Sequence, residues 1–503
     1  MEHKKSALII GAGLGGLSLA AMLAKRGYAV TVIEKNESIG GRARLWQKDG
    51  YTFDMGPSWY MMPDVFEHYF SMMGEHIEEY LSLEKLSPSY RIFLKSDGTH
   101  HDFYGDIEKN KATFESFESG SGKVLEEFLA TTKEQYEIAK HEFMYKNYDS
   151  IFDFFNKRVM KLGAKLPLFK KQKAIIEKLF KSEILRKVMQ YQTVLLGTAP
   201  GDTPGIYSMM NYVDFGLGIW YPKGGIVSVP RALESIAKKY GVSVITNAPV
   251  EKIIVEGGRA QGVLLANGTE HRADIVVSNA DIVHTDRVLL GGEYQQYSDR
   301  SWNKRTLAPS AFILYLGVSG TLPKARHHNL IFSEHWEESF SQIFGKTKSW
   351  PTDPSLYVCA PSKTDSTVAP EGCENLFVLV PIAPGLEYTE AFVKEYRDKV
   401  IAELATAFEA PDLASRIVVE RSYCIKDFIA DYNAFKGTAL GLAHTLGQTA
   451  IFRPNNIHPK IPNLYFVGAG TNPGIGMPIC LISAELAYKR IEGIADPFPL
   501  EKI

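Results

Sequence analysis

The amino-acid sequence predicts an α/β fold in which one domain is assembled from distant segments of the chain. Two glycine-rich stretches, at residues 11–16 and 468–476, each follow a short apolar strand and lead into a helix. The chain of 503 residues also exceeds the usual size of one domain, so two or three domains are expected. We predict a discontinuous, Rossmann-like nucleotide-binding domain beside a second domain with a mixed sheet.

The first element lies in an uncharged stretch from Ser6 to Ala24. The length of this stretch and its basic start are compatible with a signal peptide or a membrane span. Its cluster of glycines argues against both, because each glycine in a helix interior costs up to about 1 kcal/mol relative to alanine. The stretch is therefore interpreted as a strand at residues 8–10, a tight turn and a helix at about residues 15–25.

The turn has the spacing Gly-x-Gly-x-x-Gly, which is typical of dinucleotide binding. Gly11 permits the turn, Gly13 lets the backbone approach a pyrophosphate, and Gly16 lets the helix pack closely on the strand. The helix amino terminus then offers free N–H groups to the phosphates. Glu34 ends the following strand, "AVTVIEK", where its carboxylate is placed to accept hydrogen bonds from ribose hydroxyls.

The next block, "EKNESIGGRARLWQKDGYTFDMGPS", favours FAD over NAD as the dinucleotide. Gly40, Gly41 and Arg42 follow the ribose-binding acid closely and bring flexible backbone and a guanidinium to the same pyrophosphate. An arginine in that place forms strong charge-assisted contacts with phosphate. The alternative is an ordinary glycine turn followed by a solvated arginine.

A second ligand-binding stretch, "LYFVGAGTNPGIGMP", lies near the end of the chain. Gly468 and Gly470 allow a ligand to approach closely, and a helix begins near Met477 or Pro478. Its amino terminus is suited to stabilising negative charge on a reduced flavin ring. The alternative is a simple connection between a strand and a helix.

A third piece, residues 221–281, contains a helix, the strand "VSVIT" and several short strands, and contributes Val250 and Ala280 as candidate contacts. Its last strand, "ADIVVSNAD", ends in small polar residues suited to a cofactor wall. The nucleotide-binding domain is therefore predicted from residues 1–90, 223–300 and 441–503, the substrate domain from 91–140 and 301–440, and a helical region from 141–222.

Composition and charge exclude several other classes of protein. The 56 basic and 58 acidic residues nearly cancel, so no overall attraction to nucleic acid is expected. The four cysteines are far apart and form no Cys-x-x-Cys pair, which excludes a clustered zinc site and a redox dithiol. Reduced thiols in the cytoplasm are therefore expected.

The combined motifs resemble the bacterial and fungal type of phytoene desaturase. These FAD-dependent carotenoid desaturases belong to the wider group of amine-oxidase and GDI-like flavoproteins. The resemblance rests on the fingerprint with "GGRA", on "DGYTFDMGPS", "GIWYPKGG" and "GAGTNPGIGMP", and it covers nearly the whole chain. It implies FAD as cofactor, phytoene or a related acyclic carotenoid as substrate, and quinone or oxygen as electron acceptor. Alternatives are a carotenoid oxidase or ketolase, a flavin amine oxidase, and a prenyl-binding escort of the GDI type.

The motifs and the resemblance together predict a set of FAD contacts along the chain. In such a desaturase a hydride passes to the flavin and a proton leaves the neighbouring carbon, with lycopene as the expected product from phytoene. The predicted contacts are Gly11, Gly13, Gly15, Gly16, Glu34, Lys35, Gly40, Gly41, Arg42, Gly56, Pro57, Ser58, Val250, Ala280, Gly468, Gly470, Thr471, Gly476 and Met477.

The resemblance brings no catalytic residue with it, and Asp153 is the candidate that the sequence offers. It lies among apolar and aromatic residues of an expected helix, where a partly buried carboxylate could stabilise an allylic cation or take its proton. The alternative is an exposed acid or a helix cap. His327 and His328 are adjacent and are expected in a loop, and His444 is expected to be structural, so no metal site is predicted.

The region 157–187 carries a strong local charge. It contains eleven Lys or Arg and two acids, a charge of +9 in a chain whose net charge is −2. Leucine, isoleucine and phenylalanine interleave with these charges, and such basic amphipathic helices lie on anionic membranes. A solvated face or a nucleic-acid patch is the alternative. The helical region is therefore predicted to face a membrane, making the protein cytoplasmic and peripherally membrane-associated.

Overall fold

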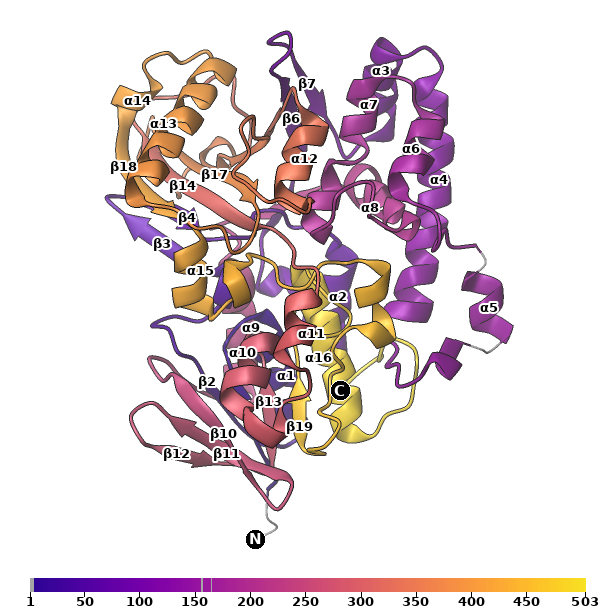
Figure 1. The fold of residues 1–503 in the computed structure, drawn as a ribbon, viewed down its shortest axis with the longest axis vertical. Coiled ribbons are helices and arrows are strands. Elements are labelled where there is room, and N and C mark those ends of the chain that lie inside the picture. Colours follow the sequence, from indigo (N-terminus) through magenta and orange to yellow (C-terminus); the bar gives the residue numbers. More distant parts are fainter. Residues whose placement is uncertain (1–3, 155–156, 164) are drawn as a thin grey trace.

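The structure, a computed structural model, describes residues 4–154, 157–163 and 165–503. Figure 1 shows a parallel sheet with its helices in the lower half of the view, a mixed sheet at the upper left and a group of helices at the upper right. The α/β fold with a mixed second sheet is therefore confirmed.

The parallel sheet has five strands in the order β19-β13-β1-β2-β9. Helices cover one face and a small antiparallel sheet covers the other, so the strands are apolar on both sides. The strands are β1 (Ser6–Ile10), β2 (Ala29–Ile33), β9 (Ser243–Ile245), β13 (Ile275–Ser278) and β19 (Leu464–Phe466). The covering elements are α1 (Leu14–Lys25), α9 (Ser228–Lys239) and α16 (Met477–Glu492) on one face, and β10 (Val250–Glu256), β11 (Arg259–Leu265) and β12 (Glu270–Arg272) on the other.

The register of this sheet brings four strand ends to one edge. Ile10 of β1 pairs with Ile33 of β2 and with Ser278 of β13, and Ser278 pairs with Phe466 of β19. The segments that follow these strands therefore meet at the carboxyl edge, which is where open α/β sheets bind ligands.

The mixed sheet has seven strands in the order β18-β14-β17-β16-β15-β6-β7, and only β15 and β6 pair in parallel within it. Buried side chains of α13 (Glu390–Ala407) share a hydrophobic core with this sheet. The strands are β6 (Tyr90–Leu94), β7 (His100–Phe103), β14 (Ser310–Val318), β15 (His328–Phe332), β16 (Leu356–Cys359), β17 (Glu374–Ile382) and β18 (Ile417–Tyr423).

The helices at the upper right of Figure 1 share a hydrophobic core with side chains of β6 and β15. They are α3 (Ile107–Phe117), α4 (Ser121–Ala139), α6 (Gln172–Leu179), α7 (Glu183–Val188) and α8 (Met209–Tyr212), with α5 (Lys157–Gly163) beside them. The other elements are α2 (Pro63–Met72), α10 (Ile282–His284), α11 (Asp299–Lys304), α12 (Trp336–Phe344), α14 (Leu413–Arg416), α15 (Ile425–Tyr432) and the two-stranded pairs β3 (Leu45–Lys48) with β4 (Tyr51–Asp54) and β5 (Leu83–Lys85) with β8 (Trp220–Pro222).

The predicted segments supply the two sheets, but α3 and α4 of the helical group come from 91–140, outside the predicted helical region 141–222. Residues 1–90, 223–300 and 441–503 supply every strand of the parallel sheet, and 91–140 with 301–440 supply the mixed sheet, whose β6 starts one residue earlier. The apolar stretch from Ser6 to Ala24 forms β1 and the fully interior helix α1. Across the described residues, no helix combines the length and apolar character needed to cross a bilayer.

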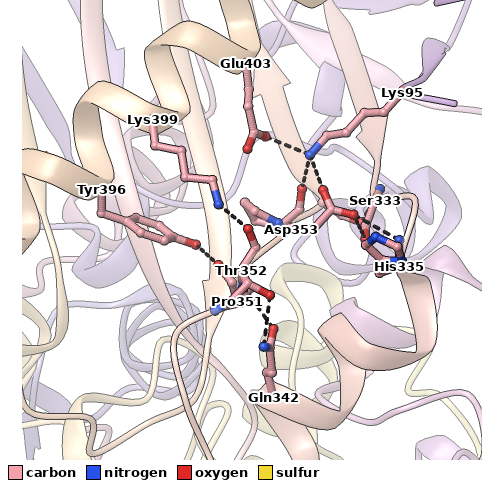
Figure 2. A network of polar contacts seen from close by, with 12 residues as sticks. Lys95, Ser333, His335, Gln342, Pro351, Thr352, Asp353, Tyr396, Lys399 and Glu403 are labelled. Carbon is pink, nitrogen blue, oxygen red and sulfur yellow. Dashed lines mark hydrogen bonds and ion pairs between the residues drawn. The ribbon is translucent and has the colours of Figure 1, made fainter. Parts of the chain in front are cut away.

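A polar cluster fixes the loop that leads into β16 (Figure 2). The ammonium of Lys95 contacts Asp353 Oδ1 at 2.8 Å and Glu403 Oε2 at 2.7 Å. The second oxygen of Asp353 accepts from the Ser333 hydroxyl at 2.7 Å, and Tyr396 donates to the carbonyl of Pro351 at 3.0 Å. These contacts join β6, β15 and α13 to one loop, and so position the first residues of β16.

Candidate functional site

A cavity of about 1330 Å³ runs from the carboxyl edge of the parallel sheet to the mixed sheet and the helical layer. Every residue predicted to contact the cofactor lines this cavity except Gly16, Gly468 and Thr471. Ligand pockets for drug-sized molecules measure about 300–1,000 Å³, so this cavity has room for a dinucleotide together with a second ligand.

The turn after β1 has the backbone that close ligand approach requires. Gly11 has φ +95°, which favours glycine, and a Cβ at Gly13 would lie only 2.9 Å from the amide nitrogen of Asn279. A Cβ at Gly16 would overlap the carbonyl oxygen of Gly11, so this glycine serves the packing of α1 on the turn rather than the cavity wall. No side chain caps the amino terminus of α1, which leaves its N–H groups available to an anion.

Glu34 is buried beside this turn and already holds two backbone groups. Its Oε2 accepts from the N–H of Ala12 at 2.8 Å, and its Oε1 accepts from the N–H of Asn36 at 2.9 Å. Each carboxylate oxygen retains a further lone pair, so a ribose hydroxyl can still donate to it. The carboxylate thus anchors the glycine turn as well as facing the cavity.

Arg42 is the best indicator that the cavity holds an anion. Its Nε is buried and has no hydrogen-bond partner among the described residues, although the ring of Tyr432 lies 5.3 Å from its guanidinium carbon. A buried, unpaired guanidinium N–H is costly, and a phosphate oxygen would satisfy it. Together with the glycine turn and the free amino terminus of α1, this N–H fits the pyrophosphate of a dinucleotide.

The carboxy-terminal stretch reaches the same cavity. Gly470, Gly476 and Met477 line it, and α16 begins at Met477, as the sequence predicts. Thr471 is buried behind the wall, where its hydroxyl donates to the carbonyl of Pro454 at 2.6 Å. A Cβ at Gly468 would overlap the side chain of Asn279, so Gly468 also acts through packing.

Sequence reasoning did not identify two polar residues of this edge. The Asn279 amide donates to the carbonyl of Gly11 at 3.2 Å, which ties the first glycine turn to the end of β13. Asp281 accepts from the N–H groups of Val283 and His284, and burial raises the pKa of its carboxyl group. Both residues flank the predicted contact Ala280. The polar end of "VVSNAD" is therefore the sequence signal from which Asn279 and Asp281 could be predicted.

Beyond the nucleotide edge the cavity becomes apolar and aromatic. Its walls come from the helical layer and the mixed sheet, and include Leu166, Leu195, Leu330, Phe340 and Leu379. Four large apolar side chains both line the cavity and reach solvent, which places the mouth between them: Phe169 (90% exposed), Met160 (57%), Phe452 (55%) and Leu446 (43%).

The structure does not place Asp153 in the cavity wall that it describes. Asp153 lies in a 3₁₀ turn, Ile151–Phe154, and its Oδ2 accepts from the N–H groups of Asp149 and Ser150 at 2.8 and 2.9 Å. The carboxylate therefore caps a turn, which is the alternative that the sequence left open, and its position gives no support to a catalytic role.

The histidines differ from expectation in their surroundings. His328 belongs to β15 rather than a loop, His327 directly precedes it, and both are buried. One ring nitrogen of each lies within 4.8 Å of the other and of the Cys359 sulfur. Burial raises the pKa of the Cys359 thiol, which keeps the sulfur protonated. His444 lines the cavity, where its Nε2 accepts from the N–H of Ile475 at 2.9 Å.

Comparison with known proteins gives the same assignment along nearly the whole chain. Residues 14–491 match the family model described as flavin containing amine oxidoreductase. A carotenoid 3,4-desaturase of Haloarcula japonica is 45% identical over 97% of this chain and 98% of its own length. A zeta-carotene-forming phytoene desaturase of Myxococcus xanthus is 37% identical over 96% of this chain and 93% of its own length.

A solved structure of putrescine oxidase bound to putrescine has the same fold. It is 15% identical, with a TM-score of 0.62 over 98% of this chain and all of that one. The chain therefore belongs to the flavin containing amine oxidoreductase family, among its carotenoid desaturases, and is an FAD-dependent oxidoreductase.

Proposed function

We propose that this enzyme introduces a conjugated double bond into an acyclic carotenoid such as phytoene. The observation that carries the proposal is the apolar cavity that continues from the cofactor edge to a mouth of exposed Phe169, Met160, Phe452 and Leu446. Phytoene is a hydrocarbon with no heteroatom, so a protein must recognise it by shape and dispersion contacts. When bound, the flavin of FAD takes up the hydride that the substrate loses.

The residues of this chain supply position and environment for that reaction. Gly11, Gly13 and Arg42 would hold the pyrophosphate, and Glu34 would hold the ribose. The walls of the mixed sheet and helical layer keep the polyene extended and exclude water from the reacting carbons. Repeated binding of the same carotenoid in this cavity, with a new double bond formed each time, would convert phytoene to lycopene.

Desaturation at the 3,4 position of an already conjugated carotenoid is the second candidate. It is favoured by the carotenoid 3,4-desaturase that is 45% identical to this chain. Both candidates need the same cavity and differ in which carbons reach the flavin.

Pigment analysis separates these candidates. We expect cells that make phytoene to accumulate conjugated carotenoids up to lycopene when they express this chain. If the pigment of phytoene-producing cells stays unchanged while lycopene-producing cells gain a further double bond, the 3,4-desaturation is correct instead. No change in either strain would contradict both.

Repeating the assay with purified enzyme under anaerobic conditions, with and without an added quinone, tests whether quinone or oxygen reoxidises the flavin.

We further propose that the mouth docks on a membrane, from which the insoluble substrate enters. Lys161, Lys170 and Lys171 are exposed beside the apolar mouth residues. Cationic and apolar side chains in one patch favour an anionic bilayer surface. The protein would thus be peripheral on the cytoplasmic leaflet.

The charge of this region is smaller than the count along the chain suggests. Acids from other segments pair with three of its cations: Glu142 with Arg158 at 2.6 Å, Glu134 with Lys165 at 2.6 Å, and Glu337 with Lys173 at 2.7 Å. Residue 164 of the basic region, like residues 155–156 before it, lies outside the described residues. The docking surface is therefore better tested at Phe169 and Lys170 than at the paired lysines.

Replacing Phe169 and Lys170 by glutamate is expected to weaken liposome binding by about a hundredfold. Burying a phenylalanine contributes about 1.5–3 kcal/mol and each lysine near an anionic surface roughly 1 kcal/mol. Sedimentation with anionic vesicles at low salt measures the loss, and bound FAD should remain. The matched control replaces Val418 and Lys394, which are exposed outside the cavity wall, by glutamate. Equal sedimentation of both variants and the unmodified protein would remove this surface as the docking site.

A further inference from the structure

A chain of hydrogen-bonded side chains leads from the cavity wall into the mixed sheet. The hydroxyls of Ser58 and Tyr357 are 2.6 Å apart, and the Tyr357 hydroxyl lies 2.8 Å from Nδ1 of His328. Ser58 and Tyr357 both line the cavity. His328 is fully buried behind them.

These hydrogen-bonded side chains lie where the predicted cofactor contacts at the carboxyl edge of the parallel sheet meet the apolar part of the cavity. Ser58 directly follows Gly56 and Pro57, which line the cavity and are predicted FAD contacts. The ring of Trp59, also in the cavity wall, stacks on His328 with centroids 4.4 Å apart and planes 5° from parallel. The imidazole is therefore held in one orientation, with its Nδ1 facing Tyr357.

Desaturation releases a proton from the substrate, so a group that accepts this proton is needed where the substrate carbons meet the cofactor. In the described cavity wall, the carboxylates of Glu34 and Asp281 lie at the carboxyl edge of the parallel sheet, and that of Asp431, on α15, is paired with Arg44 at 2.5 Å. His444 already accepts a backbone hydrogen bond through Nε2, and its Nδ1 faces the hydroxyl of Tyr207 at 2.8 Å.

We propose that Ser58, Tyr357 and His328 form the path that takes up the substrate proton, an inference that rests on the proposed desaturation. After the hydride has left one carbon, the C–H bond of the neighbouring carbon breaks and its electron pair forms the new double bond. The Ser58 oxygen takes the proton as its own hydroxyl proton moves to Tyr357, and the Tyr357 proton moves to Nδ1 of His328. One proton leaves the substrate and one arrives on His328.

Ser58 and Tyr357 are the catalytic residues in this path, and His328 acts through Tyr357. Burial lowers the pKa of His328, so the imidazole is neutral, and in the tautomer that carries its proton on Nε2 the Nδ1 atom accepts from the Tyr357 hydroxyl. The same burial makes the protonated imidazole short-lived. Nε2 of His328 has no partner in the structure, and the neighbouring His327 ring lies 4.5 Å away as the next group inward.

The test compares Tyr357→Phe and His328→Gln with Tyr69→Phe. Tyr69 is a buried tyrosine outside the cavity wall whose hydroxyl donates to a backbone carbonyl, so its variant also loses one buried hydrogen bond. General acid–base catalysis contributes about 10²–10⁴-fold, and we expect single-turnover product formation to fall by at least a hundredfold in Tyr357→Phe and His328→Gln only. FAD content and KM should stay within a few-fold of the unmodified enzyme.

Two further readouts separate a proton path from a structural role. A solvent deuterium isotope effect on product formation is expected in the unmodified enzyme and in Tyr69→Phe, and should be absent from the residual rate of Tyr357→Phe. Nitrogen-15 spectra of histidine-labelled holoenzyme should contain the signal of the hydrogen-bond-accepting nitrogen of His328. This signal should disappear in His328→Gln and shift in Tyr357→Phe.

Three outcomes would overturn the proposal. Turnover within threefold of normal in Tyr357→Phe would show that the proton leaves elsewhere. A stoichiometric metal in the purified enzyme, lost in Cys359→Ser, would assign His327, His328 and Cys359 to metal binding instead. If the unmodified enzyme converts no carotenoid while binding FAD, the proposed function itself has failed, whereas a relay failure leaves that conversion intact.

Discussion

The Gly16→Ala protein is expected to purify with about a tenth or less of the normal FAD content and with matching loss of oxidoreductase activity. The added Cβ overlaps the carbonyl oxygen of Gly11 and lies 3.1 Å from the Asn279 amide nitrogen. Gly11 belongs to the glycine turn, and Asn279, at the end of β13, is hydrogen-bonded to it, so relief of the overlap moves the turn itself. Overpacking of this kind costs about 1–3 kcal/mol, and every 1.4 kcal/mol lost from cofactor binding is tenfold in affinity.

The absorbance of the flavin bands relative to the protein band measures this loss directly. Gly201→Ala is the matched control, because a Cβ there meets no atom within 4 Å and its backbone is free of the left-handed conformation. Normal FAD content in Gly16→Ala would show that the turn tolerates displacement and that the fingerprint glycine is not needed for the cofactor.

The Asp214→Asn protein is expected to be more stable than the unmodified protein at neutral pH and equally stable near pH 4. Asp214 is buried, and its Oδ2 accepts from Tyr90 and Tyr191 hydroxyls and from the Gln192 amide at 3.0, 2.8 and 2.8 Å. Its Oδ1 has no partner. An asparagine can place its amide oxygen at the position of Oδ2 and its amide nitrogen at the position of Oδ1.

The pH dependence follows from the direction of the pKa shift. Burial raises the pKa of Asp214 to about 6 in the folded protein, above the value near 3.9 in an unfolded chain. The folded state therefore binds the proton more tightly, and the stability from this group is present below pH 3.9 and lost as the pH rises through about 6. Two pKa units correspond to roughly 3 kcal/mol, which is the expected gain of Asp214→Asn at pH 7.

Urea unfolding at a series of pH values, followed by coincident fluorescence and circular dichroism, measures the difference. Asp49→Asn provides the control, since that exposed carboxyl stays in water on folding. A constant difference between Asp214→Asn and the unmodified protein from pH 4 to pH 7 would mean that the buried carboxyl does not titrate in this range.

Local sequence patterns were sufficient for the cofactor edge because each of its parts is short and continuous. The β1–turn–α1 unit, the acid at the end of β2 and the start of α16 at Met477 all depend on residues within about twenty positions. Glycine spacing and strand periodicity are read directly at that range. The resemblance to carotenoid desaturases added the cofactor and the reaction class, which the comparisons confirm at 37–45% identity.

Asp153 and the basic region show what such local patterns do not contain. The apolar neighbours of Asp153 predict a partly buried carboxylate in a helix. The side chain is partly buried, but it lies in a 3₁₀ turn and accepts from the backbone N–H groups of Asp149 and Ser150. The +9 charge of residues 157–187 ignored Glu134, Glu142 and Glu337, which arrive from other elements. Both cases have the same cause, because the partners of a side chain are set by folding and not by its sequence neighbours.

The sequence by itself determined the α/β class, the FAD fingerprint and the oxidoreductase family, since these rest on backbone conformations that glycine and alternating apolar residues impose locally. Only the tertiary structure decided the shape of the substrate cavity and the chemistry of its wall. Ser58 is hundreds of residues away from His328 and Tyr357 in the sequence, and these two lie on different strands. The three residues meet because β15 and β16 pair in register next to the segment that follows β4. Long-range strand pairing and close packing create that contact, and neither leaves a local signature in the chain.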